Sequence, residues 1–243
     1  MLEILFFVSA FISEVIGTIA GFGSSTLFLP LALLFVDFKT ALILVAFFHI
    51  FGNLGRMAFF RHGIDKKLIL IFGVPSIILT VIGALLVEYA SQEMLKLILG
   101  MFLLVFSTTS IIKPGFKFKP SGRNAVIGGV LSGFFAGLIG TGGALRSAFL
   151  SAFNLKKTVY IATAAAIALA VDVTRIPIYF RSGFFESRFY IYLPILFVIA
   201  LAGSYSGKKI IDKIPQDTFR RMVFVAVALI SLKFVYDGIT FLI

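Results

Sequence analysis

One arginine of the sequence stands inside an apolar stretch rather than in a basic gap. Arg146 closely follows Gly142 and Gly143. An arginine at the centre of a membrane helix costs roughly 2.5–3.5 kcal/mol on insertion scales, so its presence needs a reason. A guanidinium offers paired donors to an oxoanion, which makes Arg146 a candidate substrate ligand. The alternatives are an arginine that reaches the membrane surface, or one that pairs with Glu14 or Asp172.

Glycines gather at two breaks between apolar segments, at 17–23 and at 128–143. Neighbouring glycines lower helix propensity by about 1 kcal/mol each, and irregular backbone at membrane depth is tolerated only where it is packed or lines a cavity. Free N–H groups and a half-helix dipole favour an anion there, whereas the alternative is a kink that serves packing. The predicted substrate ligands are Arg146, Gly142, Gly143, Thr141, Ser24, Ser25, Gly23, Asn53 and Arg175.

Further polar side chains fall within the apolar segments. His49, Asn53 and Arg56 are spaced i, i+4, i+7, which puts them on one face of a helix. Asp172 and Arg175 are i, i+3 neighbours on a later helix. Both faces are predicted to turn inward, although the alternative for the two arginines is to reach the membrane surface. Histidine has an ordinary pKa of about 6.5, which suits proton transfer. The candidate proton carriers are His49, Glu14 and Asp172, and a structural role is the alternative for each.

The charges inside the segments do not cancel. Arg56, Arg146 and Arg175 face only Glu14 and Asp172, which leaves one positive charge when histidine is neutral. An anionic substrate would neutralise that charge.

The elements that must hold these residues follow from composition. Hydrophobic residues make up 60% of the chain and charged residues 14%, and the mean hydropathy is +1.08. Soluble domains contain about 45–50% apolar residues, so the composition predicts an all-α, polytopic integral membrane protein. The chain contains no cysteine, and it shows no signal-peptide pattern, so the first helix is expected to be retained. The predicted segments are 2–21, 25–36, 41–60, 68–88, 95–112, 124–140, 144–153, 158–180, 189–206 and 219–242.

These segments form two related halves, 1–113 and 124–243, joined by a cytoplasmic linker at 114–123. Short sequences recur in the same order in both halves, and internal repeats of this size are frequent in secondary transporters. The matching sequences are Gly21-Phe22-Gly23 with Gly140-Thr141-Gly142, Phe60-Arg61-His62-Gly63 with Phe180-Arg181-Ser182-Gly183, and Ser91-Gln92-Glu93 with Pro215-Gln216-Asp217.

The charges of the gaps predict an orientation. Three gaps, at 61–67, 113–123 and 207–221, are basic, whereas the gap at 88–93 is acidic. Cytoplasmic loops carry an excess of Lys and Arg, so the basic gaps are expected inside and the acidic gap outside. The matched gaps 88–93 and 207–221 then lie on opposite sides, which predicts inverted repeats with both termini outside. This topology explains the net charge of +11 without a nucleic-acid partner.

On these residues the chain resembles the TauE/SafE family of sulfite and organosulfur anion exporters. Each half has a Gly-rich turn, a short apolar segment and a small loop, here Gly17–Pro30 with Asp37–Thr40 and Gly133–Arg146 with Asn154–Lys157. The first turn lacks the glycine run that is usual in the family. The resemblance implies transport of small sulfur-containing or carboxylate anions.

The predicted function is that of a secondary transporter, a multi-pass permease of the cell membrane. It would move a small anion, such as sulfite, a sulfonate or a related oxoanion, with proton coupling as an option. No catalytic residue, metal or cofactor is predicted, and the partners are the anion and the lipid bilayer, with a homo-oligomer left open. An intramembrane enzyme that uses Ser24 and His49 as nucleophile and base is one alternative, and an uncoupled anion channel is another.

Overall fold

The computed structural model describes residues 2–60, 63–113, 118–211 and 216–242, without the side chains of 216–220 and 242. The described part of the chain is helical and contains no strand. The first half comprises α1 (Leu2–Ala20), α2 (Ser25–Ala32), α3 (Phe38–Phe59), α4 (Lys66–Leu68), the π-helical segment η1 (Ile69–Gly73), α5 (Val74–Leu86), η2 (Val87–Tyr89) and α6 (Gln92–Ile112). The second half comprises α7 (Gly122–Ile139), α8 (Gly143–Leu150), η3 (Ser151–Phe153), α9 (Lys157–Arg181), η4 (Ser187–Phe189), α10 (Tyr192–Ile210) and α11 (Gln216–Leu242).

Most of the predicted segments are found within a few residues of their expected ends. Local capping sets several starts: the side chains of Asp37, Ser91 and Ser121 each accept a hydrogen bond from the backbone N–H three residues later. The short segments expected at 25–36 and 144–153 form helices of only eight residues each. Eight residues extend about 12 Å along a helix, too little to cross a bilayer core of about 30 Å.

The molecule carries its apolar side chains outward and many polar ones inward. Eight helices or joined helical segments within the described residues are long and apolar enough to cross a membrane. Large apolar side chains on them are exposed, among them Val105 at 67% and Val198 at 64%, whereas Glu14 and Asp172 are at most 1% exposed. This distribution suits a lipid environment, and the prediction of a polytopic α-helical membrane protein is confirmed.

The main helix contacts join one half of the chain to the other. The helix α1 packs on α10, α5 on α7, α3 on α9 and α6 on α11. Glycines permit the closest approaches: a Cβ added at Gly83 would lie 2.3 Å from the carbonyl oxygen of Phe134, and one added at Gly203 would lie 2.7 Å from the Glu14 Cβ. The two halves therefore share one core.

The glycines of α7 form the small-residue face that their spacing indicates. Cβ atoms added at Gly129, Gly133 and Gly137 would lie 2.1–2.3 Å from carbonyl oxygens of η1 and α5. Hydroxyls of Ser76 and Thr80 donate to carbonyls of α7 across the same contact, at 3.0 Å. Close packing, rather than substrate binding, explains these three glycines.

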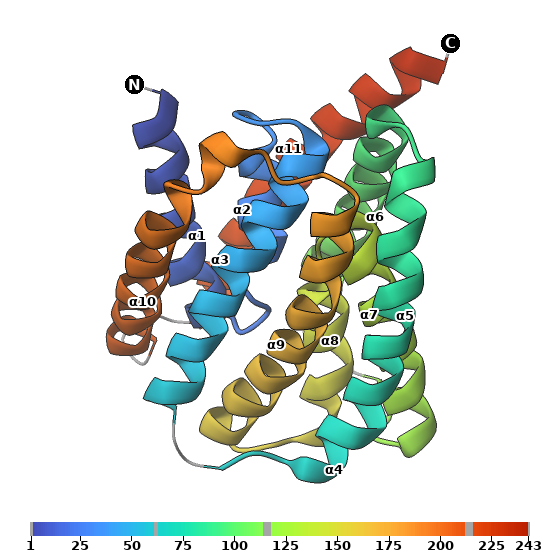
Figure 1. Cartoon of the computed structure of the whole chain (residues 1–243). Coiled ribbons are helices and arrows are strands. Elements are labelled where there is room, and N and C mark those ends of the chain that lie inside the picture. Colours follow the sequence, from blue (N-terminus) through green and yellow to red (C-terminus); the bar gives the residue numbers. More distant parts are fainter. Residues whose placement is uncertain (1, 61–62, 114–117, 212–215, 243) are drawn as a thin grey trace.

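The start of α1 and the end of α11 lie at one end of the molecule, and α9 begins at the opposite end (Figure 1). The inversion of the halves, and the membrane side that each end faces, stay predictions. Some matched or basic-gap residues, Arg61, His62, Lys117, Lys213 and Pro215, lie outside the described residues.

Candidate functional site

The two glycine breaks meet inside the molecule. Gly21, Gly23 and Gly140 have φ values of +79°, +88° and +73°, in the left-handed region that favours glycine. The hydroxyls of Thr26 and Thr141 are hydrogen-bonded across the contact at 3.0 Å. The hairpin formed by α1 and α2 therefore touches the hairpin formed by α7 and α8, tip to tip.

Arg146 lies on α8 at this meeting point and is only 5% exposed. Its Nη2 atom is 3.7 Å from the position of a Cβ built on Gly23 and 3.5 Å from one built on Gly143, so the guanidinium lies against both breaks. Among the described residues, no hydrogen bond or ion pair to this guanidinium is found. Arg146 is not a surface arginine, because it is buried, and it forms no ion pair with Glu14 or Asp172, which bind Arg56 and Arg175 instead.

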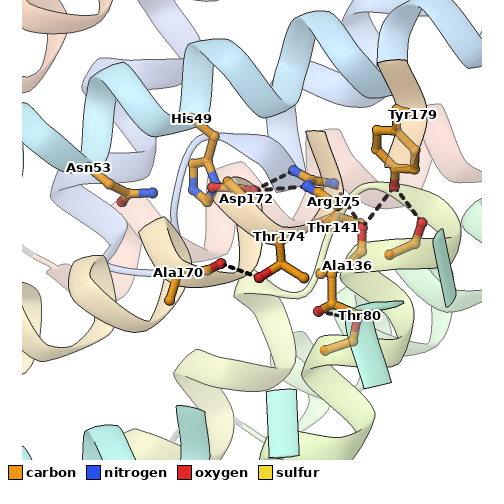
Figure 2. Close-up of polar contacts among 12 residues, drawn as sticks. His49, Asn53, Thr80, Ala136, Thr141, Ala170, Asp172, Thr174, Arg175 and Tyr179 are labelled. Atoms are coloured by element: carbon orange, nitrogen blue, oxygen red, sulfur yellow. Dashed lines mark hydrogen bonds and ion pairs between the residues drawn. The ribbon is translucent and has the colours of Figure 1, made fainter. Parts of the chain in front are cut away.

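Asp172 joins His49 of α3 to Arg175 of α9, as Figure 2 shows. One carboxylate oxygen lies 2.8 Å from His49 Nδ1, and the other accepts from Arg175 Nε at 2.9 Å and from its Nη2 at 2.7 Å. Arg175 Nη1 also donates to the carbonyl oxygen of Ala136 on α7 at 2.8 Å, and the Tyr179 hydroxyl donates to the carbonyl of Gly137. Arg175 therefore faces the interior, and its donors are engaged by protein.

The other ring nitrogen of the histidine has no such partner. His49 Nε2 lies 2.9 Å from the position of a Cβ built on Gly23, so this nitrogen and Arg146 Nη2 approach the same point within 4 Å. Five buried side-chain atoms find no hydrogen-bond partner among the described residues: His49 Nε2, Ser24 Oγ, Asn53 Nδ2, Ser13 Oγ and Glu14 Oε2. Buried polar atoms are usually hydrogen-bonded, so it is unusual that His49 Nε2 and Ser24 Oγ, beside the first break, are not.

Glu14 of α1 binds Arg56 of α3 in a second cluster. Arg56 Nη2 lies 2.6 Å from Glu14 Oε1, its Nη1 donates to Asn53 Oδ1 at 2.8 Å, and its Nε donates to Thr18 Oγ1 at 3.1 Å. The Ser204 hydroxyl of α10 donates to the same Glu14 oxygen at 2.7 Å. Arg56 is thus directed inward.

One buried arginine has no counter-charge among the described residues. The charged side chains buried in the described chain form two pairs, Glu14 with Arg56 and Asp172 with Arg175, plus Arg146. No group of acidic, histidine or cysteine residues in the described chain could hold a metal ion. The arrangement can therefore bind one small anion by charge and by N–H and O–H donors.

A comparison with known families assigns the chain to one of them. The sequence model of the family described as Sulfite exporter TauE/SafE matches residues 5–234. The chain belongs to the TauE/SafE family. No curated protein and no solved structure matches it. The family description makes this chain a membrane transporter of the sulfite-exporter type, so the recognition made from the residues is confirmed.

The predicted ligands of this TauE/SafE chain differ in whether their polar atoms are already hydrogen-bonded within the protein. Arg146, Gly23 and Ser24 contribute unpartnered atoms or close contacts at the meeting of the breaks, whereas Asn53, whose Nδ2 is also unpartnered, accepts from Arg56 in the second cluster. Thr141 is bonded to Thr26, and the carbonyl of Gly142 accepts from Ser132 Oγ at 2.8 Å. Ser25 and Gly143 are buried at the starts of α2 and α8.

Tyr160 was not predicted from the sequence. Its hydroxyl on α9 lies 3.1 Å from the carbonyl oxygen of Gly21 and 3.0 Å from Ser147 Oγ, so it joins the first break to α8. Thr18 and Ser204, which support Glu14, were missed too. Single hydroxyl residues in apolar helices carry no sequence signal of their partners, because the partners are distant in the chain.

Proposed function

We propose that this protein is a secondary transporter of a small monovalent oxoanion, which binds between the two glycine breaks. The observation that carries the proposal is the buried guanidinium of Arg146, which lies against Gly23 and Gly143 without a partner among the described residues. An uncompensated buried charge is costly, so a structure retains it where a ligand supplies the opposite charge. Sulfite in its singly charged form and sulfonates are the substrates that we consider first.

The proposed shell around the anion uses donors from both halves. The guanidinium of Arg146 supplies the charge, and the Ser24 hydroxyl and Asn53 amide supply neutral donors that are unpaired among the described atoms. Ser25, Gly142 and the other backbone groups at the breaks complete it. In this proposal Arg175 positions Asp172 and α7 instead of touching the anion, because its donors already bind Asp172 and Ala136.

Proton coupling is part of the proposal, and it is carried by His49 and Asp172. Their hydrogen bond of 2.8 Å places an ionisable ring between a fixed carboxylate and the proposed anion. Glu14 remains a weaker candidate, since Arg56 and Ser204 both bind its Oε1 atom.

Alternating access would come from movement of the two hairpins relative to the shared core. Leu29 and Leu42, both 0% exposed, pack against Gly140, whereas Tyr160 bonds to Gly21 near the end at which α9 begins. We propose these contacts as the two closures of the site. The cell membrane is the proposed location, with the end where α9 begins facing the cytoplasm.

The decisive experiment measures sulfite flux in liposomes that contain the purified protein. Arg146→Gln should lower the flux by about 100-fold or more, because a charge-assisted bidentate contact is lost in a low-dielectric site. Arg188→Gln is the matched control, since Arg188 is exposed and pairs only with Glu186 among the described residues. Flux that is normal in Arg146→Gln would refute the site.

The proposed inversion has its own test. The natural chain has no cysteine, so single cysteines at Lys119 and Lys209 can be labelled with a membrane-impermeant thiol reagent in intact cells. Both positions should be protected until the membrane is opened. Labelling of the two from opposite sides would overturn the inverted arrangement and the placement of both termini outside.

An intramembrane enzyme stays the second candidate because of one observation. His49 binds Asp172 through Nδ1, and the Ser24 hydroxyl nearby has no partner among the described residues, which are three parts of a nucleophilic triad. Ser24 and His49 are not hydrogen-bonded to each other, and the family match favours a transporter. Covalent labelling of Ser24 by a serine-directed probe would favour the enzyme.

A further inference from the structure

Asp172 determines which nitrogen of His49 carries a proton. An ionised carboxylate only accepts hydrogen bonds, and Asp172 is held in that form by Arg175, which donates to it twice. His49 Nδ1, at 2.8 Å from the carboxylate, must therefore carry the hydrogen. In neutral His49 the other nitrogen, Nε2, then has a lone pair and acts as an acceptor.

That acceptor is directed into the proposed anion site. His49 is 3% exposed, and its Nε2 has no partner among the described residues. It approaches the same point as the guanidinium of Arg146, beside Gly23. The site therefore combines strong donors with one acceptor, whereas a site for a fully deprotonated anion would need donors alone.

We propose that His49 makes the site selective for oxoanions that retain one acidic proton, such as hydrogensulfite, over sulfonates of equal charge. This rests on the proposed anion site. The O–H group of the substrate donates to His49 Nε2, and its other oxygens accept from Arg146. A sulfonate has no such hydrogen, so one of its oxygens would face the Nε2 lone pair.

The charges around His49 support this choice. Asp172 and Arg175 on α9 form one neutral pair, and Arg56 on α3 with Glu14 on α1 forms another. Among the charged side chains buried in the described chain, only Arg146 on α8 remains, and a monoanion balances it. Protonation of His49 to suit a sulfonate would add a second positive charge that the sulfonate leaves uncompensated. A sulfite dianion together with one proton has the same total charge as hydrogensulfite. The site therefore binds the dianion and the proton together.

The test compares two probes, sulfite and methanesulfonate, by calorimetric titration of the purified protein at pH 6, where sulfite retains one proton. The natural protein should bind hydrogensulfite at least about tenfold more tightly, a factor that one buried hydrogen bond to a charged group can supply. In His49→Gln the side-chain amide can turn its NH₂ group toward a sulfonate. The ratio should then fall to about two or less, mainly because methanesulfonate binds better.

A second variant alters the tautomer and leaves the ring in place. In Asp172→Asn the amide can donate to Nδ1, which puts the hydrogen on Nε2 and should reverse the preference toward methanesulfonate. Methanesulfonate binding also shows that either variant is folded. An unchanged ratio in both variants would overturn the role of His49.

The same titrations separate this inference from the proposed function. Arg146→Gln should abolish binding of both probes. If it does so while His49→Gln keeps the ratio of the natural protein, the anion site stands and the selectivity proposal fails. If the natural protein binds neither probe, the proposed function fails, and the selectivity proposal fails with it.

Discussion

The first half of the chain and the second hold their buried arginines in different ways. Arg56 on α3 finds its counter-charge on another helix, at Glu14 of α1, whereas Arg175 on α9 finds it on its own helix at Asp172. The same sequence spacing that relates Gly21 to Gly140 also relates Arg56 to Arg175 and Asn53 to Asp172. Both arginines bond to the residue three positions earlier, a neutral amide in one half and a carboxylate in the other.

Matched positions of the two halves also differ in the charge of the residue that they carry. By the same sequence spacing, Leu27 of α2 corresponds to Arg146 of α8, and Glu14 of α1 corresponds to Gly133 of α7. The carboxylate of the first half thus has a packing glycine as its counterpart, and the unpaired cation of the second half has a leucine. Among the described residues, the repeated framework therefore leaves one buried cation unpaired, which in our proposal gives the molecule one anion site.

The largest expected effect is a difference in stability between variants of Arg56, which is paired, and variants of Arg146, which is not. Arg56→Gln should lower the free energy of unfolding by about 3–5 kcal/mol, because the buried carboxylate of Glu14 would lose its cation. Arg146→Gln should leave the stability unchanged or raise it. Thermal denaturation in detergent measures both, and an equal loss would show that Arg146 is also paired. The double variant Glu14→Gln with Arg56→Gln should recover part of the loss.

The next effect tests the glycine that stands where the first half has Glu14. A Cβ at Gly133 would lie 2.1 Å from the carbonyl oxygen of Ser76, so Gly133→Ala must separate α7 from α5. We expect a loss of about 1–3 kcal/mol, as in other overpacked cores. Gly122→Ala, at the start of the same helix, is the control, since nothing described lies within 4 Å of its added Cβ. Equal denaturation temperatures for the two variants would argue against this packing.

A smaller effect is expected when the first half is made more like the second. Asn53→Asp would place a carboxylate beside Arg56 and bring the net charge of the buried groups from one positive charge to zero. Anion affinity should fall by about tenfold or more, as expected for unit charges several ångströms apart at intermediate dielectric. Asn53→Ser removes the amide without adding charge and should have a smaller effect. Titration with sulfite would measure both, and equal affinities would place Asn53 outside the field of the anion.

The smallest effect concerns the contact between the halves at Tyr160. Tyr160→Phe removes hydroxyl contacts to Gly21 and Ser147, each worth about 0.5–1.5 kcal/mol. A cysteine placed at Ser24, which is 0% exposed, should then react several-fold faster with a water-soluble thiol reagent. Thr174→Val is a suitable control, because Thr174 bonds only within its own helix among the described residues. No difference in rate would mean that Tyr160 does not close the site.

The helices, the breaks and most of the polar residues of the proposed site could be recognised in the sequence. Long apolar runs admit only helices in a bilayer, so composition and run length were sufficient for the fold class. Gly21, Gly23 and Gly140 indicated the breaks because few other residues adopt their backbone angles. Arg146 was recognisable because a charge inside an apolar run is rare.

The partners of these residues could not be predicted, because they come from helices distant in the chain. Sequence spacing put His49, Asn53 and Arg56 on one face of a helix. Only the packing of the helices shows that His49 of α3 contacts Asp172 of α9, and that Arg56 of α3 contacts Glu14 of α1. Hydrogen bonds and ion pairs act over a few ångströms, so their assignment needs the tertiary structure. The sequence by itself determined that one buried positive charge is left over. The tertiary structure alone decided that this charge is Arg146 and that it lies between the two glycine breaks.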